Sequence, residues 1–267
     1  DDYDVFIVHY SCGLYHPDYI SESVLERLTQ TEAVKIVFAQ DEYDNTNELV
    51  RKINLIKPDY YYTCVPYNLH KKVFKGLDSG ISLVNNLTGY VTREHQLFAE
   101  HLDAFSRDIE ISYKGRPLHP KYGQLGFQKW HYGRLLKEYC LKNAVSHDIS
   151  VTEEERLYWA DWEKLLLSSK AMLITPSGSD VFDFDGSIRS DLDNEYGEDL
   201  MDNYEKIVND LASYEKKFST MAQISPKVFE TMAYGCVPVV VGDYLPDEFV
   251  PFENYMPIAM TDAALEL

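Results

Sequence analysis

The chain has 267 residues, of which 45% are hydrophobic and 26% are charged, and its formal net charge is −19. These values are ordinary for a soluble globular protein that buries a core in one large domain or two small lobes. The acidic balance argues against a nucleic-acid-binding protein, because phosphate backbones are bound by clustered Lys and Arg. No apolar run approaches the roughly 18–20 residues that a membrane span needs.

The start of the chain and its cysteines suggest a cellular context. The sequence opens on Asp-Asp-Tyr-Asp, without Met or a signal-like apolar stretch, which leaves open that it is a fragment of a longer protein. Its cysteines lie far apart and form no CxxC pair; they are Cys12, Cys64, Cys140 and Cys236. This pattern favours a reduced, cytoplasmic protein in which the cysteines are small packing residues.

The first part of the chain alternates short apolar runs with amphipathic segments. The runs are rich in β-branched and aromatic residues, as buried strands are, and they span 4–10, 34–41, 60–65 and 81–85. Helical patterns lie between them, at 21–30 and 47–56. Such alternation predicts a parallel sheet covered by helices.

A second series of the same kind follows. Strands are predicted at 109–115, 171–176 and 237–243, and a helix at 127–143. We therefore predict an α/β protein with two Rossmann-like lobes, 1–106 and 107–267, hinged within about 92–108. The second lobe carries an acidic insertion around 186–220, which is predicted to be helical at 204–218.

Charge is segregated along the chain. Residues 107–142 hold eight Lys and Arg against three acidic residues, whereas residues 151–220 hold seventeen acidic residues against seven basic ones. The basic stretch is compatible with a local pocket for a small anionic ligand, and equally with a helix that exposes a basic face to solvent.

Ligands of open α/β sheets bind outside the carboxyl ends of the strands, so the residues that follow each strand are candidate ligand-binding residues. His9 and Asp41 follow the first two strands, and Glu42 comes directly after Asp41. In the second lobe, Arg116 follows one strand and Ser177 follows the next. Polar residues follow nearly every predicted strand, which predicts a ligand-binding cleft, although some of these residues could merely cap helices.

The segment 224–243 is the most informative. Ser225 and Pro226 resemble a helix start and Gly235 a helix end, and a buried strand follows directly. Lys227 lies in the first helical turn and is predicted to share an outer face with Glu230 and Tyr234. A cation at that end is unfavourable unless an anion such as a diphosphate neutralises it. Glu230 is then placed to accept hydrogen bonds from two ribose hydroxyls.

This segment, SPKVFETMAYGCVPVVVGD, resembles the donor-site helix and strand of GT-B glycosyltransferases, and its continuation is most similar to exostosin-like transferases. YKGR at 113–116 is similar to the Gly-Arg that opens the donor lobe of many such enzymes. QDEY, LTGYV, KYGQLGFQKW and SDVFDFDGSI look like CgeB-like, spore-maturation bacterial surface-polysaccharide glycosyltransferases. Together these matches imply the GT-B fold, in which two lobes face each other across a cleft. The usual first strand of the first lobe is not evident in this sequence, which points to a trimmed first lobe.

The resemblance implies roles for particular residues. Glu230 matches the glutamate that binds the donor ribose, Lys227 and Arg116 match residues that contact the diphosphate, and Lys121 is a further candidate. Retaining members of the family carry a second acid in a Pro-Ser-X-X-Glu-X-Phe-Gly segment, eight residues from the first acid. PSGSDVFD at 176–183 is similar to that segment and aligns Asp180 with its glutamate. Here Asp180 and Glu230 are much farther apart in sequence, which departs from that pattern. The predicted donor-binding set is Arg116, Lys121, Ser177, Asp180, Ser225, Lys227 and Glu230.

The expected activity is transfer of a sugar from a nucleoside-diphosphate donor to a glycan or lipid-linked acceptor, in cell-surface polysaccharide synthesis, without metal or cofactor. His9 and Asp41 are the candidate bases of an inverting transfer, and a retaining transfer needs none. Asp183 and Asp185 fit a metal site, a sugar-binding or structural loop, or a solvated loop. A nucleotide-sugar epimerase and a non-catalytic binding domain remain alternatives, and peripheral membrane association stays open.

Overall fold

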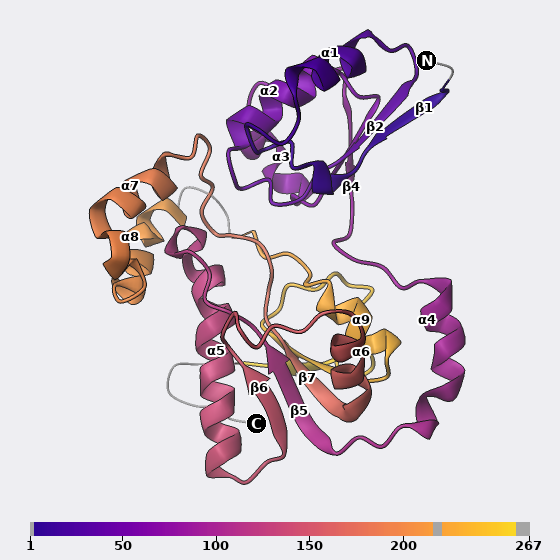
Figure 1. The fold of residues 1–267 in the computed structure, drawn as a ribbon, viewed down its shortest axis with the longest axis vertical. Helices are drawn as coiled ribbons and strands as arrows, with labels where there is room; N and C mark the ends of the chain where they lie inside the picture. The colour runs from indigo at the N-terminus through magenta and orange to yellow at the C-terminus, as the bar shows by residue number, and fades with distance from the viewer. Residues whose placement is uncertain (1–2, 216–220, 260–267) are drawn as a thin grey trace. The chain divides into compact units, whose positions relative to one another are not determined.

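The computed structural model describes residues 3–215 and 221–259. The chain forms two compact units, and the connection crosses between them more than once (Figure 1). The first unit comprises 1–87, 121–123 and 178–221, and the second comprises 88–120, 124–177 and 222–267. The predicted boundary at 106/107 therefore lies inside the second unit.

The acidic segment differs from the prediction as well, because residues 178–221 belong to the first unit instead of the second lobe. The physical reason is apolar packing: Phe182 and Met221 are both buried in the core of the first unit. A short β-bridge between Asp44 and Asp183 fixes the return of the chain to that unit.

The first unit is a parallel sheet with strands in the order β1-β2-β3-β4. The strands confirm the four predicted ones with shorter bounds: β1 Val5–Val8, β2 Val34–Phe38, β3 Tyr60–Thr63 and β4 Ser82–Asn85. The helices between them are α1 Glu22–Gln30, α2 Thr46–Ile56 and α3 His70–Val73, with 3-10 turns at η1 Tyr10–Cys12 and η2 Tyr67–Leu69. Both predicted helices are confirmed.

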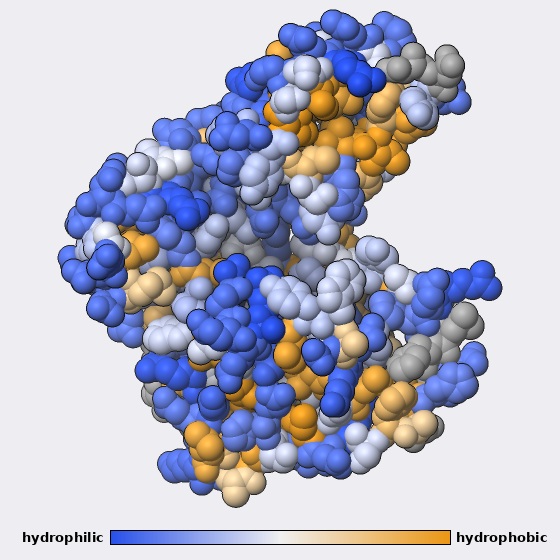
Figure 2. Space-filling view, in the orientation of Figure 1, coloured by the Kyte–Doolittle hydropathy of each residue, from blue (hydrophilic) through white to orange (hydrophobic). Residues whose placement is uncertain are grey.

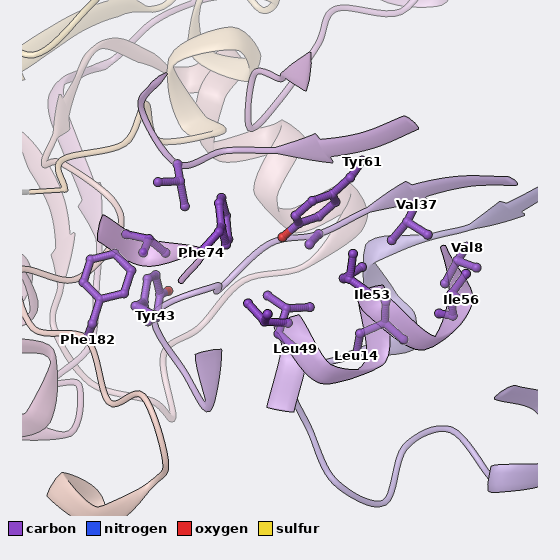
Figure 3. Close-up of a cluster of buried hydrophobic side chains, with 14 of the residues drawn as sticks. Val8, Leu14, Val37, Tyr43, Leu49, Ile53, Ile56, Tyr61, Phe74 and Phe182 are labelled. Atoms are coloured by element: carbon purple, nitrogen blue, oxygen red, sulfur yellow. The ribbon is translucent and has the colours of Figure 1, made fainter. Parts of the chain in front are cut away.

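Strands added in sequence order by right-handed crossovers place all their helices on one face of the sheet. On that face Val37 and Tyr61 pack against Leu49 and Ile53 of α2, and this forms the core of the unit (Figure 3). The opposite face is also apolar, and Val5, Ile7 and Tyr60 are exposed there, Ile7 at 63%. Figure 2 shows apolar residues gathered on the surface of this unit.

The acidic segment of the first unit forms a small helical layer. It consists of α7 Ser187–Tyr196, η5 Gly197–Leu200 and α8 Tyr204–Glu215. The helix predicted at 204–218 is confirmed as far as residue 215, and 216–218 lie outside the described residues. Val181, Ile207 and Leu211 form a small core of their own beneath these helices.

The second unit is a five-stranded parallel sheet in the order β6-β5-β7-β8-β9. Its strands are β5 Ile109–Lys114, β6 His147–Ser150, β7 Ser169–Ile174, β8 Val237–Val241 and β9 Met256–Ile258. Its helical segments are α4 Arg93–Phe98, η3 Ala99–Ala104, α5 Gly123–Lys142, α6 Trp159–Ser168 and α9 Lys227–Ala233. The 3-10 turn η4 Pro120–Tyr122 precedes α5, and its Lys121 and Tyr122 belong to the first unit. The three predicted strands and the predicted long helix are confirmed, whereas β6, β9 and α6 were not predicted.

This second sheet is covered on both faces. Leu173 and Val239 point to the core beneath α5, whereas Met172 and Val240 point to the core beneath α6 and α9. The alternation follows from the two-residue period of a strand. Because β6 and β7 flank β5 on opposite sides, the winding direction of the sheet reverses between β5 and β7.

The α/β class with two parallel sheets is thus confirmed, and the facing of two lobes across a cleft stays a prediction. Within the described ranges, no helix is both long enough and apolar enough to cross a membrane. Cys64, Cys140 and Cys236 are buried, which confirms their expected role as packing residues, whereas Cys12 is only partly buried.

Candidate functional site: a basic and aromatic cavity in the second unit

A cavity of about 580 Å³ lies in the second unit, among residues that follow β5 and β7. The cavity lies at the point where the strand order of the sheet reverses. The loops that follow the two strands leave the sheet toward opposite faces at such a point, and this opens a crevice between them. The volume is typical of small-molecule sites. The wall combines cations, aromatic rings and one carboxylate: Tyr113, Lys114, Gly115, Arg116, Leu118, Lys129, Arg156, Leu157, Tyr158, Trp159, Trp162, Thr175, Ser177, Ser225, Pro226, Lys227 and Glu230.

Lys227, the first residue of α9, is a partly buried cation of this wall. Its Nζ donates a hydrogen bond to the main-chain oxygen of Lys114 and lies 5.4 Å from the ring centre of Tyr113 and 5.6 Å from that of Trp162. Burial, followed by the positive charge of Lys129, lowers the pKa of Lys227 to about 8. An anion bound in the cavity would favour the charged ammonium.

Glu230 lies one helical turn beyond Lys227 and is held by an aromatic donor. The indole Nε1 of Trp162 donates to its Oε2 at 3.0 Å. Burial raises the pKa of Glu230, while that hydrogen bond and the charge of Lys227 act in the opposite direction. Oε1 remains available to accept hydrogen bonds from a ligand.

Two arginines share one carboxylate at the edge of the cavity. Glu153 accepts from Arg116 at 2.9 Å and from Arg156 at 3.2 Å. Lys114, which also lines the cavity, pairs with Asp148 at 2.7 Å. Five cations line the cavity, and three of them are paired with Asp148 or Glu153. With the lining acid Glu230 this leaves five cations beside three acids, in a chain that is strongly acidic overall. The arrangement provides a local positive potential for an anionic ligand.

Backbone pairing brings the two lining loops together. Ser177 and Gln223 exchange main-chain hydrogen bonds of 2.9 and 2.8 Å, which place the segment before α9 beside the exit of β7. Gly89 supports α9 from the outside, where a Cβ would come within 2.7 Å of the Phe229 ring. At the exit of β5, a Cβ on Gly115 would come within 2.7 Å of Tyr113. A side chain at either position therefore requires the neighbouring ring to move.

The helix predicted after Ser225 is confirmed, as is its end at Gly235. The N–H of Gly235 bonds to the Met232 oxygen, the N–H of Cys236 bonds to the Thr231 oxygen, and Gly235 has φ +65°. These are the two bonds of a Schellman motif. The predicted outer face is wrong at Tyr234, which is buried within the apolar core of the second unit.

Five of the seven predicted donor-binding residues line this one cavity: Arg116, Ser177, Ser225, Lys227 and Glu230. The other two do not line it. Lys121 is buried in the first unit, where its Nζ lies 2.7 Å from Asp44, and Asp180 is 3% exposed in that same unit. Both residues therefore belong to the first unit and not to the unit that holds the cavity.

The two candidate bases lie in the first unit after β1 and β2, as predicted. His9 is exposed, and its Nδ1 lies 2.8 Å from the Ser11 hydroxyl. Asp41 is also exposed, has φ +56°, and accepts a 2.5 Å hydrogen bond from the Tyr43 hydroxyl. Each keeps a surface position from which a proton can be exchanged.

Glu42, which comes directly after Asp41, has a different environment. It is fully buried and accepts from Tyr61, Thr63 and the Cys64 amide, so it fastens the end of β2 to that of β3. Burial raises its pKa to about 7.

The neighbouring aspartates organise the start of α7. Asp183 is buried, and its carboxylate accepts from the amides of Ile188 and Arg189 at 3.1 and 3.0 Å. Asp185 accepts from the Ser187 amide at 3.1 Å. Such contacts satisfy the free N–H groups of a first helical turn. In the part of the chain that the structure describes, no group of three or more His, Cys, Asp or Glu side chains could hold a metal ion.

The lining residues from the segment before α6 and within it were not predicted from the sequence; they are Arg156, Leu157, Tyr158, Trp159 and Trp162. Three aromatic residues within five positions, two residues after Arg156, were the available signal. These residues lie at the start of the short helix α6, which was not predicted, so they were not considered as lining residues.

Comparison with known proteins adds no family: no family model, no curated protein and no solved structure matches the chain.

Proposed function

We propose that this protein is a glycosyltransferase whose second unit binds a nucleoside-diphosphate sugar. The observation that carries the proposal is the cavity beside β5 and β7, in which Lys227 and Glu230 lie one helical turn apart within a cationic wall. A nucleoside diphosphate offers both the anion and the vicinal hydroxyls that such a pair recognises.

The electrostatic match concerns the leaving group. When the bond between the sugar and the diphosphate breaks, negative charge develops on the diphosphate oxygen that leaves. Lys227 and Arg116 would stabilise that charge, as preorganised cations do in a site that excludes water. An anion that reaches Arg116 can also replace Glu153 as its partner, because Glu153 is half-exposed.

The acceptor step requires a base if the transfer inverts the sugar. The acceptor hydroxyl then gives its proton to the base while its oxygen forms the new bond to the anomeric carbon and the diphosphate leaves. His9 and Asp41, both exposed after strands of the first unit, are the proposed bases. A retaining transfer would not need them.

The test is incubation of the protein with a panel of nucleoside-diphosphate sugars, with and without oligosaccharide or lipid-linked acceptors. We expect release of nucleoside diphosphate only when an acceptor is present. Conversion of the donor into an isomer without acceptor would indicate an epimerase instead. Donor binding without turnover across the panel would indicate a binding domain, and absence of binding would contradict the proposal.

A further inference from the structure

Trp159 stands out in the cavity wall of the second unit. It is 88% exposed although it lines the cavity. Among the residues that the structure describes, its side chain has no hydrogen-bond or ring partner. Its backbone has φ +50°. A bulky residue in the left-handed region is an outlier that costs free energy, and such residues cluster at functional sites.

Tyr158 lies beside Trp159 and presents a second ring to the cavity. The guanidinium carbon of Arg156 lies 4.9 Å from its ring centre, so a cation stacks on this ring. Leu157 completes a short, continuous wall of apolar and aromatic surface. An exposed wall of this kind is suited to a flat, aromatic ligand group.

The position of this wall relative to Glu230 and Lys227 indicates which part of a nucleotide would contact it. Trp162, which binds Glu230, follows Trp159 by three residues, so both lie on one side of α6. If Glu230 holds the ribose hydroxyls and Lys227 faces the phosphates, the base at the other end of the ribose is left to the aromatic wall.

We propose that Tyr158 and Trp159 form the nucleobase platform of the cavity, and that the platform favours purine over pyrimidine nucleoside diphosphates. This inference rests on the proposed function of the cavity. Stacking on an indole depends on the area of the π-face, which is larger in a purine. The lining residues include no Asn or Gln, so no side-chain amide is available there to read the edge of a base.

The test is calorimetric titration of ADP, UDP and inorganic pyrophosphate into the parent protein and into Trp159→Ala and Trp159→Phe. Tyr67→Ala is the control, because Tyr67 is a similarly exposed aromatic side chain of the first unit. The high exposure of Trp159 predicts that its variants fold, and the thermal midpoint of each variant verifies this.

We expect the parent to bind ADP more tightly than UDP. Trp159→Ala should weaken ADP between about fivefold and a hundredfold, the range of one base–aromatic stack. The same variant should weaken UDP less and leave pyrophosphate unchanged, while Trp159→Phe retains most of the ADP affinity. The Tyr67→Ala control should bind all three ligands as the parent does.

Three outcomes would overturn the inference. In the first, the parent binds nucleotides but Trp159→Ala binds ADP equally well. In the second, Trp159→Ala leaves both nucleotides unchanged and raises the KM of a saccharide acceptor, which would assign the rings to the acceptor. In the third, the parent binds neither nucleotides nor pyrophosphate, and then the proposed function fails together with the platform.

Discussion

Replacing Lys227 by Met should make the unliganded protein more stable and its diphosphate site weaker. The structure lowers the pKa of this ammonium from 10.5 to about 8, chiefly through burial. That difference corresponds to about 3 kcal/mol of unfavourable free energy in the folded state at neutral pH. Methionine has a similar length and no charge, so the substitution removes this cost.

The substitution also has a cost, because the Lys114 oxygen loses its hydrogen bond from Lys227, worth about 1 kcal/mol. We therefore expect a net gain of about 1–2 kcal/mol in the free energy of unfolding at pH 7, and a rise of a few degrees in the thermal midpoint. Loss of a charge-assisted hydrogen bond to phosphate, about 1.5–3 kcal/mol, should weaken a nucleoside diphosphate by about ten- to a hundredfold.

The dependence on pH checks the cause. Between about pH 8 and 10.5 the folded protein binds fewer protons at Lys227 than the unfolded chain does, so its stability rises with pH in this window. The advantage of Lys227→Met should therefore be largest below pH 8 and shrink toward pH 10. Lys164→Met, which removes an exposed cation of α6, is the matched control and should show neither effect.

Thermal unfolding and calorimetric titration of pyrophosphate measure both quantities on the same samples. The reasoning is refuted if Lys227→Met lowers the midpoint by several degrees and leaves pyrophosphate affinity within twofold of the parent. That result would mean that Lys227 is a structural donor to Lys114 and not a ligand-binding cation.

Three further predictions follow from the first unit. In an inverting enzyme, Asp41→Asn or His9→Ala should lower turnover by about 10²–10⁴-fold while donor affinity stays unchanged. If steady-state kinetics show losses below about tenfold for both variants, neither residue is the base. Asp183→Ala should lower the free energy of unfolding by about 1 kcal/mol through loss of the α7 cap, measured by urea titration. A divalent cation that stabilises the parent but not the variant would speak against a purely capping role. Because burial raises the pKa of Glu42 to about 7, the stability of the parent should fall as pH rises from about 4.5 to 7, and Glu42→Gln should reduce this slope in urea titrations; an unchanged slope would assign it to other groups.

The confirmed strands and helices share one property, which is a strong local pattern. The run of valines in β8 and the apolar spacing of α5 each identify an element within a single window of sequence. By contrast, β6 has the sequence His-Asp-Ile-Ser and lies at the edge of its sheet, where one polar face is tolerated. Without β6, the reversal of strand order beside β5 could not be predicted.

The candidate site was predictable where its residues follow one another along the chain. Ser225, Lys227 and Glu230 belong to a single loop and helix, and helix-start rules place them together. Lys121 was a further candidate for contacting the diphosphate, yet a three-residue excursion of the chain takes it to Asp44. Long-range packing of this kind leaves no local trace in the sequence.

The most direct test of the nucleoside-diphosphate site compares ADP with 2′,3′-dideoxy-ADP by calorimetric titration into the parent and Glu230→Ala. The parent should bind ADP more tightly by about tenfold or more, since Glu230 accepts hydrogen bonds from the ribose hydroxyls. Glu230→Ala should bind both nucleotides with the same, lower affinity, and its affinity for pyrophosphate should equal that of the parent. A parent that does not distinguish the two nucleotides, or a variant that still does, would contradict the assignment of this cavity to a nucleoside diphosphate with Glu230 at its ribose.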